Sequence, residues 1–162
     1  LIYLDADVMC LSDIAELWNT DISAYEFAAV KDAVGHIFVN PRYCNSGVLL
    51  LNMANIRKTD LLGRARKRVK TRKMFMPDQS ALNFLVKKKL ILPRKFNEQR
   101  AIRSDTVLKH FCQQFKWYGP FFKLYNYKQT DRGNVHNVLH IHEFDDIYGQ
   151  YDALYEEFGF EK

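Results

Sequence analysis

The stretch LIYLDAD, residues 1–7, holds the two features on which the predicted fold depends. Its first four residues are apolar or aromatic, which is typical of a buried β-strand. Asp5 and Asp7 follow directly, and residues two apart in an extended segment point the same way, so both carboxylates are expected to face one point. Two such carboxylates repel each other unless a cation or a shared proton relieves them. Hard oxygen ligands suit Mg²⁺ or Mn²⁺, so the stretch predicts a metal site at a strand end, with turn formation or helix capping as the alternative.

Further apolar runs alternate with helical patterns along the chain. Strands are predicted at 27–30, 47–51 and 90–92, and helices at 13–18, about 55–75 and 77–86. Beyond residue 97, the pattern favours extended structure at 107–111 and 138–141 and a helix at 151–158. Continuously apolar strands that alternate with helices predict an α/β domain with a mainly parallel sheet. The functional site of such a sheet lies outside the carboxyl ends of its strands, where the two acids fall.

Length and composition limit the class of protein. The 162 residues, 48% hydrophobic and 27% charged, supply one sizeable core and exclude a disordered chain. The longest apolar runs, such as 47–51, are far too short to cross a bilayer. Cys10, Cys44 and Cys112 are odd in number and widely spaced, which favours reduced thiols in a cytosolic protein over disulfides or a zinc site.

The net charge of +5 is concentrated in one segment. Residues 57–73 contain nine lysines and arginines and one acid, Asp60, so this segment carries +8 and the remainder −3. Apolar residues at helical spacing predict a basic amphipathic helix here. Its cationic face is either simply solvated or contacts an anionic membrane surface or acidic partner. Nucleic-acid binding is not expected, because no aromatic side chains interleave with these charges.

Three blocks of sequence follow one another in a recognisable order. They are LIYLDADV at 1–8, YCNSGVLLLN at 43–52 and PDQSALN at 77–83. In this order they resemble glycosyltransferase family eight, which includes glycogenin and bacterial lipopolysaccharide galactosyl- and glucosyltransferases. The resemblance covers 1–100 closely and 100–128 loosely. It implies a GT-A fold, a Rossmann-like sheet that binds a UDP-sugar with Mn²⁺ or Mg²⁺ as cofactor, and transfer of a hexose with retention at the anomeric carbon.

The resemblance also implies roles for the residues of the first two blocks. Asp5, Ala6 and Asp7 would contact the donor, and the two acids would hold the metal that bridges its diphosphate. The positive charge of that metal would neutralise the charge that develops on the leaving nucleotide diphosphate. Asn45 and Ser46 would contact the donor sugar, although the same turn is an ordinary entry to a strand.

Asp78 and Gln79, in the third block, would lie at the reacting face of the sugar and are the candidate catalytic residues. Asp78 is also well placed to cap the helix that starts at Pro77. Because an amide oxygen is a poor nucleophile, Gln79 is not expected to attack the sugar. A front-face reaction is favoured, in which the leaving phosphate oxygen assists the acceptor hydroxyl.

A third metal ligand is expected from the family, in which a histidine and a lysine share one segment. The nearest match is HFCQQFKW at 110–117, in which His110 would be the ligand and Lys116 would reach the diphosphate. Two alternatives stay open at this point. His140 or His142 could be the ligand, since alternation puts both on one side of a strand, and Lys128 could supply the cation.

The resemblance predicts that 1–162 form the C-terminal portion of a single GT-A domain, with a divergent segment at about 118–162. Family members carry nucleotide-binding strands before the acidic pair, so weak or no activity is expected for these residues alone. A partial sheet would expose an open edge and favour self-association.

The predicted protein is therefore a retaining hexosyltransferase of lipopolysaccharide biosynthesis. It would act on a saccharide or lipid-linked acceptor in the cytoplasm, at the inner face of the membrane. The alternative is a truncated, non-catalytic relative that binds a sugar nucleotide or serves as a scaffold.

Overall fold

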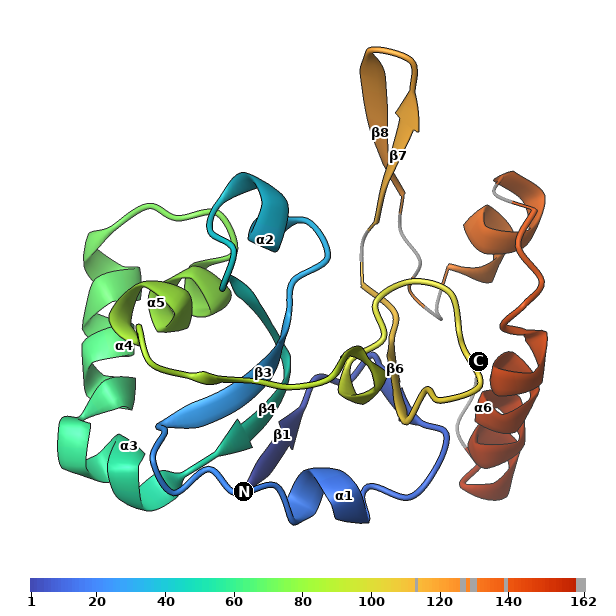
Figure 1. Ribbon diagram of the computed structural model, residues 1–162. Coiled ribbons are helices and arrows are strands. Elements are labelled where there is room, and N and C mark those ends of the chain that lie inside the picture. The colour runs from blue at the N-terminus through green and yellow to red at the C-terminus, as the bar shows by residue number, and fades with distance from the viewer. Residues whose placement is uncertain (113, 126–127, 129–130, 139, 160–162) are drawn as a thin grey trace. The chain divides into compact units, whose positions relative to one another are not determined.

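The computed structural model describes residues 1–112, 114–125, 128, 131–138 and 140–159 (Figure 1). Within 114–125, side chains are described only at 119–121 and 123. The chain divides into two compact units, the first made of Leu1–Gln99 and Asp105–His110, the second of Arg100–Ser104 and Phe111–Lys162. Among the described residues, no helix combines the length and the apolar character that a membrane span needs.

The first unit is built on a four-stranded sheet with the strand order β1-β4-β3-β5. The strands are β1 (Ile2–Leu4), β3 (Phe27–Lys31), β4 (Cys44–Leu51) and β5 (Leu90–Ile91). β4 runs antiparallel to both β1 and β3, whereas β3 and β5 are parallel. The predicted α/β class is confirmed, but the prediction of a mainly parallel sheet is wrong.

The two central strands explain why the sequence pattern suggested parallel pairing. Residues 27–30 of β3 and 48–51 of β4 alternate between two apolar clusters, one on each face of the sheet. One cluster contains Ala28, Val30, Val48 and Leu50, and the other contains Phe27, Ala29, Leu49 and Cys44. A strand that is buried on both faces has a continuous apolar sequence whichever way its neighbours run.

Three helices cover one face of this sheet, as Figure 1 shows. They are α3 (Met53–Thr59), α4 (Leu61–Thr71) and α5 (Pro77–Leu85). The basic stretch for which one helix was expected holds both α3 and α4, because Asp60 between them adopts a left-handed conformation with φ of 49°. The side chain of Asn52 accepts the Asn55 N–H at 3.1 Å and caps the start of α3.

The opposite face is covered by shorter elements. Leu17 of α1 (Ala15–Trp18) and Phe96 of the 3₁₀-helix η1 (Arg94–Phe96) are fully buried against it. The loop between β3 and β4 contains α2 (Gly35–Phe38). Two further short strands, β2 (Val8–Cys10) and β6 (Leu108–His110), form an antiparallel pair beside this face.

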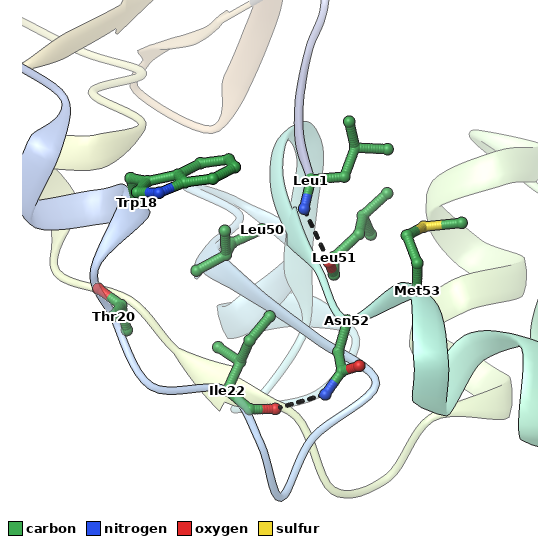
Figure 2. Close-up of a pocket in the computed structure, with 8 residues that line it drawn as sticks. All are labelled: Leu1, Trp18, Thr20, Ile22, Leu50, Leu51, Asn52 and Met53. Carbon is green, nitrogen blue, oxygen red and sulfur yellow. Dashed lines mark hydrogen bonds between the residues drawn. The ribbon is translucent and has the colours of Figure 1, made fainter.

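Strand β1 lies at the edge of the described sheet and is less buried than its sequence predicted. Leu1, Tyr3 and Leu4 are all exposed. Beside it, a hollow of about 260 Å³ opens between Leu1, the end of β4, the end of α1 and the start of α3 (Figure 2). Its lining is mostly apolar and includes Trp18, which is 61% exposed.

The described part of the second unit contains a hairpin and two helices. Strands β7 (Gln114–Tyr118) and β8 (Phe121–Tyr125) pair antiparallel, and the π-helix η2 (Asn134–Val138) precedes α6 (Asp145–Glu157). The helix predicted at 151–158 therefore begins six residues earlier. The strand predicted at 138–141 is wrong, because η2 occupies its start and His140 has a left-handed φ of 53°.

An ion pair and an aromatic cluster hold this unit together. The guanidinium of Arg132 donates to both oxygens of Asp152 at 2.6 and 2.8 Å, and these bonds raise the pKa of Arg132. Phe111, Phe144 and Tyr148 are buried, with the rings of Phe111 and Phe144 meeting edge to face at 5.4 Å. Such a pair contributes about 1 kcal/mol beyond the area it buries.

Candidate functional site

Two antiparallel ladders bring Asp5, Asp7 and His110 together. Asp5, the first residue after β1, donates its backbone N–H to the carbonyl of Gly47 in β4 at 2.8 Å. In the second ladder, Val8 of β2 lies opposite His110 of β6. Because Asp7 directly precedes Val8, this pairing places the imidazole of His110 next to the two acids.

The two acids lie on a tight turn rather than on an extended segment. The Val8 N–H donates to the Asp5 carbonyl at 3.1 Å, and Ala6 and Asp7 occupy the turn. The expectation that alternation along a strand aligns the carboxylates is therefore wrong. The turn aligns them instead: His110 Nε2 is 3.2 Å from Asp7 Oδ1 and 4.0 Å from Asp5 Oδ2. One ligand atom from each of the three residues lies within 4.8 Å of the others.

This donor set fits a divalent cation. Two carboxylates and one imidazole supply hard oxygen ligands and one nitrogen, and they leave positions open for waters or phosphate oxygens, as Mg²⁺ or Mn²⁺ requires. The Tyr3 hydroxyl donates to Asp5 Oδ1 at 2.8 Å and so orients that carboxylate. The hydrogen bond to Asp5, burial and nearby negative charge raise the pKa of Tyr3, which keeps its hydroxyl a donor.

The imidazole of His110 is buried in a close-fitting cradle. A Cβ atom at position 47 would lie 2.2 Å from His110 Cε1, so this close approach requires glycine. The Nδ1 atom of His110 lies 3.1 Å from Asn97 Oδ1, and Asn97 is fully buried. The Gly of the Asn-Ser-Gly turn is thus explained by the ring that packs on it.

Residues of the second and third sequence blocks meet next to this cradle. The backbone N–H of Ser46 donates to Gln79 Oε1 at 3.0 Å, and its hydroxyl donates to Asp78 Oδ2 at 3.2 Å. No side-chain hydrogen bond caps α5, so the alternative role of Asp78 as an N-cap is not what the structure shows. Gln79 is buried, whereas Asp78 is exposed.

Asp32 is a member of this cluster that the sequence interpretation missed. Its Oδ2 accepts from Asn45 Nδ2 at 3.1 Å and from Gln79 Nε2 at 3.3 Å. Its Oδ1 accepts the backbone N–H groups of Val34 and Gly35 at 3.1 and 2.6 Å. Like Asp5, it is an acid that directly follows a strand with an apolar sequence, and that signal was available in the sequence.

Comparison with known proteins identifies the family. Residues 1–118 match the sequence model described as Glycosyl transferase family 8. The chain belongs to this family. Family 8 is the family that the three sequence blocks predicted.

Several curated proteins are similar to this family 8 chain over part of their length. The lipopolysaccharide 1,2-glucosyltransferase of Escherichia coli K12 is 32% identical over 118 residues, which are 65% of this chain and 35% of that protein. General stress protein A of Bacillus subtilis 168 is 30% identical over 97 residues, 53% of this chain and 34% of that protein. A probable glycosyl transferase Gly of Streptococcus gordonii is 30% identical over 99 residues, 59% of this chain and 14% of that protein. The chain therefore spans about a third or less of the length of these relatives.

Solved structures show the same fold. The galactosyltransferase LgtC, in complex with donor and acceptor sugar analogs, gives a TM-score of 0.56 at 24% identity, covering 68% of this chain and 51% of that one. The glycosyltransferase GlyE of Streptococcus pneumoniae TIGR4 gives a TM-score of 0.55 at 22% identity, covering 74% and 35%. The predicted GT-A fold is confirmed.

The remaining candidate residues belong to the second unit. Lys116 lies in β7, but its side chain is outside the described residues, and Lys128 lies beyond β8. His140 is exposed, and His142 Nδ1 lies 3.1 Å from Asp145 Oδ2.

His142 belongs to a second group of metal-ligating side chains among the described residues. His136 Nε2 lies 2.7 Å from Asp145 Oδ1, and the two imidazole rings stack at 4.8 Å with only 18° between their planes. Nearly parallel rings cannot both point their nitrogen lone pairs at one ion. These contacts therefore describe a hydrogen-bonded start of α6.

Proposed function

We propose that this chain acts as a metal-dependent retaining glycosyltransferase. It moves a hexose from a UDP-sugar to a glycan or to a lipid-linked, lipopolysaccharide-type acceptor. The observation that carries the proposal is the convergence of Asp5, Asp7 and His110 beside the Ser46–Asp78–Gln79 cluster in a family 8 chain.

Asp5, Asp7 and His110 would hold Mn²⁺ or Mg²⁺. The ion supplies positive charge that offsets the charge on the departing nucleotide diphosphate. Ala6, at the exposed corner of the turn between the two acids, would let the donor approach, and Lys116 would add a second positive charge at the diphosphate.

The amide cluster supports a front-face reaction. Gln79 Oε1 accepts from Ser46, and Gln79 Nε2 donates to Asp32 at 3.3 Å, so both ends of this amide are engaged. A side chain held at both ends is suited to orient the donor sugar rather than to attack it. Asn45 and Ser46 would contact the sugar, and the exposed carboxylate of Asp78 would stabilise positive charge on the ring.

Metal-dependent donor binding tests this function. Titration calorimetry with UDP-glucose and UDP-galactose should give tighter binding when Mn²⁺ is present, and Asp5→Asn and Asp7→Asn should each weaken it by at least about tenfold. Asp21→Asn is the matched control, because Asp21 Oδ1 accepts the Ser23 N–H in an exposed loop. Release of UDP is measured in parallel.

The outcomes separate the proposed enzyme from its alternative. Mn²⁺-enhanced binding with UDP release supports the enzyme. The same binding without release supports the non-catalytic relative. Donor binding that is indifferent to Mn²⁺ and to both substitutions contradicts the metal site itself.

The basic segment 57–73 is proposed to contact an anionic membrane surface, which would hold the enzyme in the cytoplasm at the inner face of the membrane. Its nine basic residues lie mostly exposed on α3, α4 and the loop that follows. Leu62 and Val69 are exposed among them, and Phe75, two residues beyond the segment, is 83% exposed. Apolar side chains flanked by basic ones are typical of helices that lie in the headgroup region.

The open edge of β1 is proposed as a site of self-association. β1 ends the described sheet, and its exposed backbone groups can pair with a second strand. The apolar hollow beside it, lined by Leu1, Trp18 and Met53, would be covered by such a contact (Figure 2).

A further inference from the structure

We propose that Asn97 is a positioning residue that fixes the tautomer of His110. It would hold a hydrogen on His110 Nδ1 and leave Nε2 as the ring nitrogen that faces Asp5 and Asp7. The inference deepens the proposed metal site and rests on that function for its consequence, but the tautomer itself can be measured without metal or donor.

A chain of buried hydrogen bonds determines which way each amide points. It starts at Asp32, whose Oδ1 accepts the backbone N–H groups of Val34 and Gly35 and whose Oδ2 accepts from Asn45 Nδ2 at 3.1 Å. Asn45 Oδ1 then faces the other way. There it accepts the backbone N–H of Gly47 at 2.8 Å, and a backbone N–H can only donate. The orientation of Asn45 is thus fixed at both ends.

The fixed orientation of Asn45 in turn determines the orientation of Asn97 and the hydrogen position on the imidazole. Asn45 Oδ1 also accepts from Asn97 Nδ2 at 2.9 Å, so the amide nitrogen of Asn97 is committed to this bond. Asn97 Oδ1 is therefore the atom that lies 3.1 Å from His110 Nδ1. A carbonyl oxygen can only accept, and consequently Nδ1 must carry the hydrogen.

Burial makes the reverse arrangement costly. Asn97 is 0% exposed and His110 only 4%, so water cannot satisfy a mispaired atom. If Nδ1 lacked its hydrogen, two acceptors would face each other at 3.1 Å, and a buried unsatisfied polar group costs about 1–3 kcal/mol. Reversing the Asn97 amide would instead place its oxygen against Asn45 Oδ1.

The tautomer has a direct consequence at the other ring nitrogen. With the hydrogen on Nδ1, the ring nitrogen that faces Asp7 Oδ1 at 3.2 Å and Asp5 Oδ2 at 4.0 Å is Nε2. Nε2 and the two carboxylate oxygens need a hydrogen or a cation between them, and a bound cation would use the lone pair of Nε2. Metal-bound histidines commonly donate their second ring N–H to a carbonyl or carboxylate, which orients the ring, and Asn97 supplies that partner here.

Nitrogen-15 NMR of the five histidine side chains tests the tautomer directly, with His110 assigned by its absence from the His110→Ala spectrum. In the metal-free wild-type protein, His110 Nδ1 should carry a hydrogen. In Asn97→Leu this preference should be lost. Asn97→Asp should retain it if the new carboxyl group is protonated, because its carbonyl oxygen then accepts from Nδ1 while its O–H donates to Asn45 Oδ1. Asn55→Leu, which removes a half-buried amide bonded to the carbonyls of Ser23 and Tyr25, is the control and should leave the His110 signals unchanged.

Mn²⁺ affinity, followed by the loss of the free-ion electron paramagnetic resonance signal, tests the consequence. Asn97→Leu should weaken binding about 10- to 100-fold, and Asn97→Asp should recover most of that loss. A wild-type spectrum with no hydrogen on Nδ1 overturns the inference, as does an equal loss of affinity in both variants. If the wild-type protein binds no Mn²⁺ but His110 carries its hydrogen on Nδ1, the proposed function fails and the tautomer stands.

Discussion

Adding one methyl group beneath His110 should damage both the fold and the site. In Gly47→Ala, the new Cβ would lie 2.2 Å from His110 Cε1 and 2.6 Å from Nδ1, where ordinary contact begins at 3.4 Å. The ring must therefore withdraw by about 1 Å, because β4 carries residue 47 and is paired on both sides.

The size of the effect follows from these contacts. Overpacking a buried site by one methyl group costs about 1–3 kcal/mol. The displaced ring also loses or lengthens its 3.1 Å hydrogen bond to Asn97, which adds about 1 kcal/mol. We expect Gly47→Ala to lower the free energy of unfolding by about 2–4 kcal/mol and to weaken Mn²⁺ binding by at least about tenfold.

A double-mutant cycle measured by urea denaturation isolates the steric contact. In a His110→Ala background, the cost of Gly47→Ala should fall below about 1 kcal/mol, because the atoms that clash are gone. Gly149→Ala is the matched control: a Cβ there meets nothing within 4 Å, and in helix α6 alanine should be neutral or stabilising by about 0.5–1 kcal/mol. The reasoning is refuted if the cost of Gly47→Ala is the same with and without the His110 ring.

Three further predictions address the surface and a buried thiol. At low salt the protein should sediment with phosphatidylserine vesicles and not with neutral ones. Removing three charges in Arg66→Gln/Lys67→Gln/Lys70→Gln should weaken binding about 100-fold, at about 1 kcal/mol per charge. Equal binding by the wild-type and the variant protein would exclude this surface. Sedimentation velocity should show concentration-dependent association that Leu1→Lys reduces, since a charge next to edge strand β1 and in the apolar hollow opposes pairing. An unchanged profile would place the contact elsewhere. Burial raises the pKa of the Cys44 thiol from 9.0 to about 11, so at pH 8 a disulfide reagent should label exposed Cys10 and spare Cys44 until urea unfolds the chain. The folded chain keeps the Cys44 proton up to about pH 11, whereas the unfolded chain releases it near pH 9. The free energy of unfolding, measured by urea denaturation, should therefore decrease between pH 9 and pH 11, and in Cys44→Ala this decrease should be smaller.

The sequence predicted the class of the fold and most of its elements because burial leaves a direct trace in composition. The run at 27–30 became β3, and Pro77 began α5 as expected. The direction of the strands could not be predicted from composition, since β4 is apolar on both faces whether its partners run parallel or antiparallel. The break at Asp60 was also missed, because its left-handed backbone is not encoded by an apolar period.

The candidate site was predicted as a set of residues rather than as a geometry. Asp5 and Asp7 converge through a turn, and His110 reaches them through a ladder over one hundred residues away in the chain. No periodicity could have distinguished His110 from His140 or His142 on that basis. Asn97 was missed because a buried amide acquires its meaning only from the partners that surround it, whereas Asp32, an acid directly after β3, offered a signal that the interpretation did not use.

The pairing of β1 with β4 has a consequence for how this protein tolerates change. Leu4 lies opposite Val48, and the next rung joins Asp5 to Gly47, so the core and the site share one register. A slip of one position would reverse every side chain of β1 and carry its first acid away from the imidazole. Hydrogen exchange at the Asp5 amide should therefore be as slow as in the interior of β1 and β4. A variant that weakens this edge pairing should lose metal binding under conditions in which the rest of the chain is still folded.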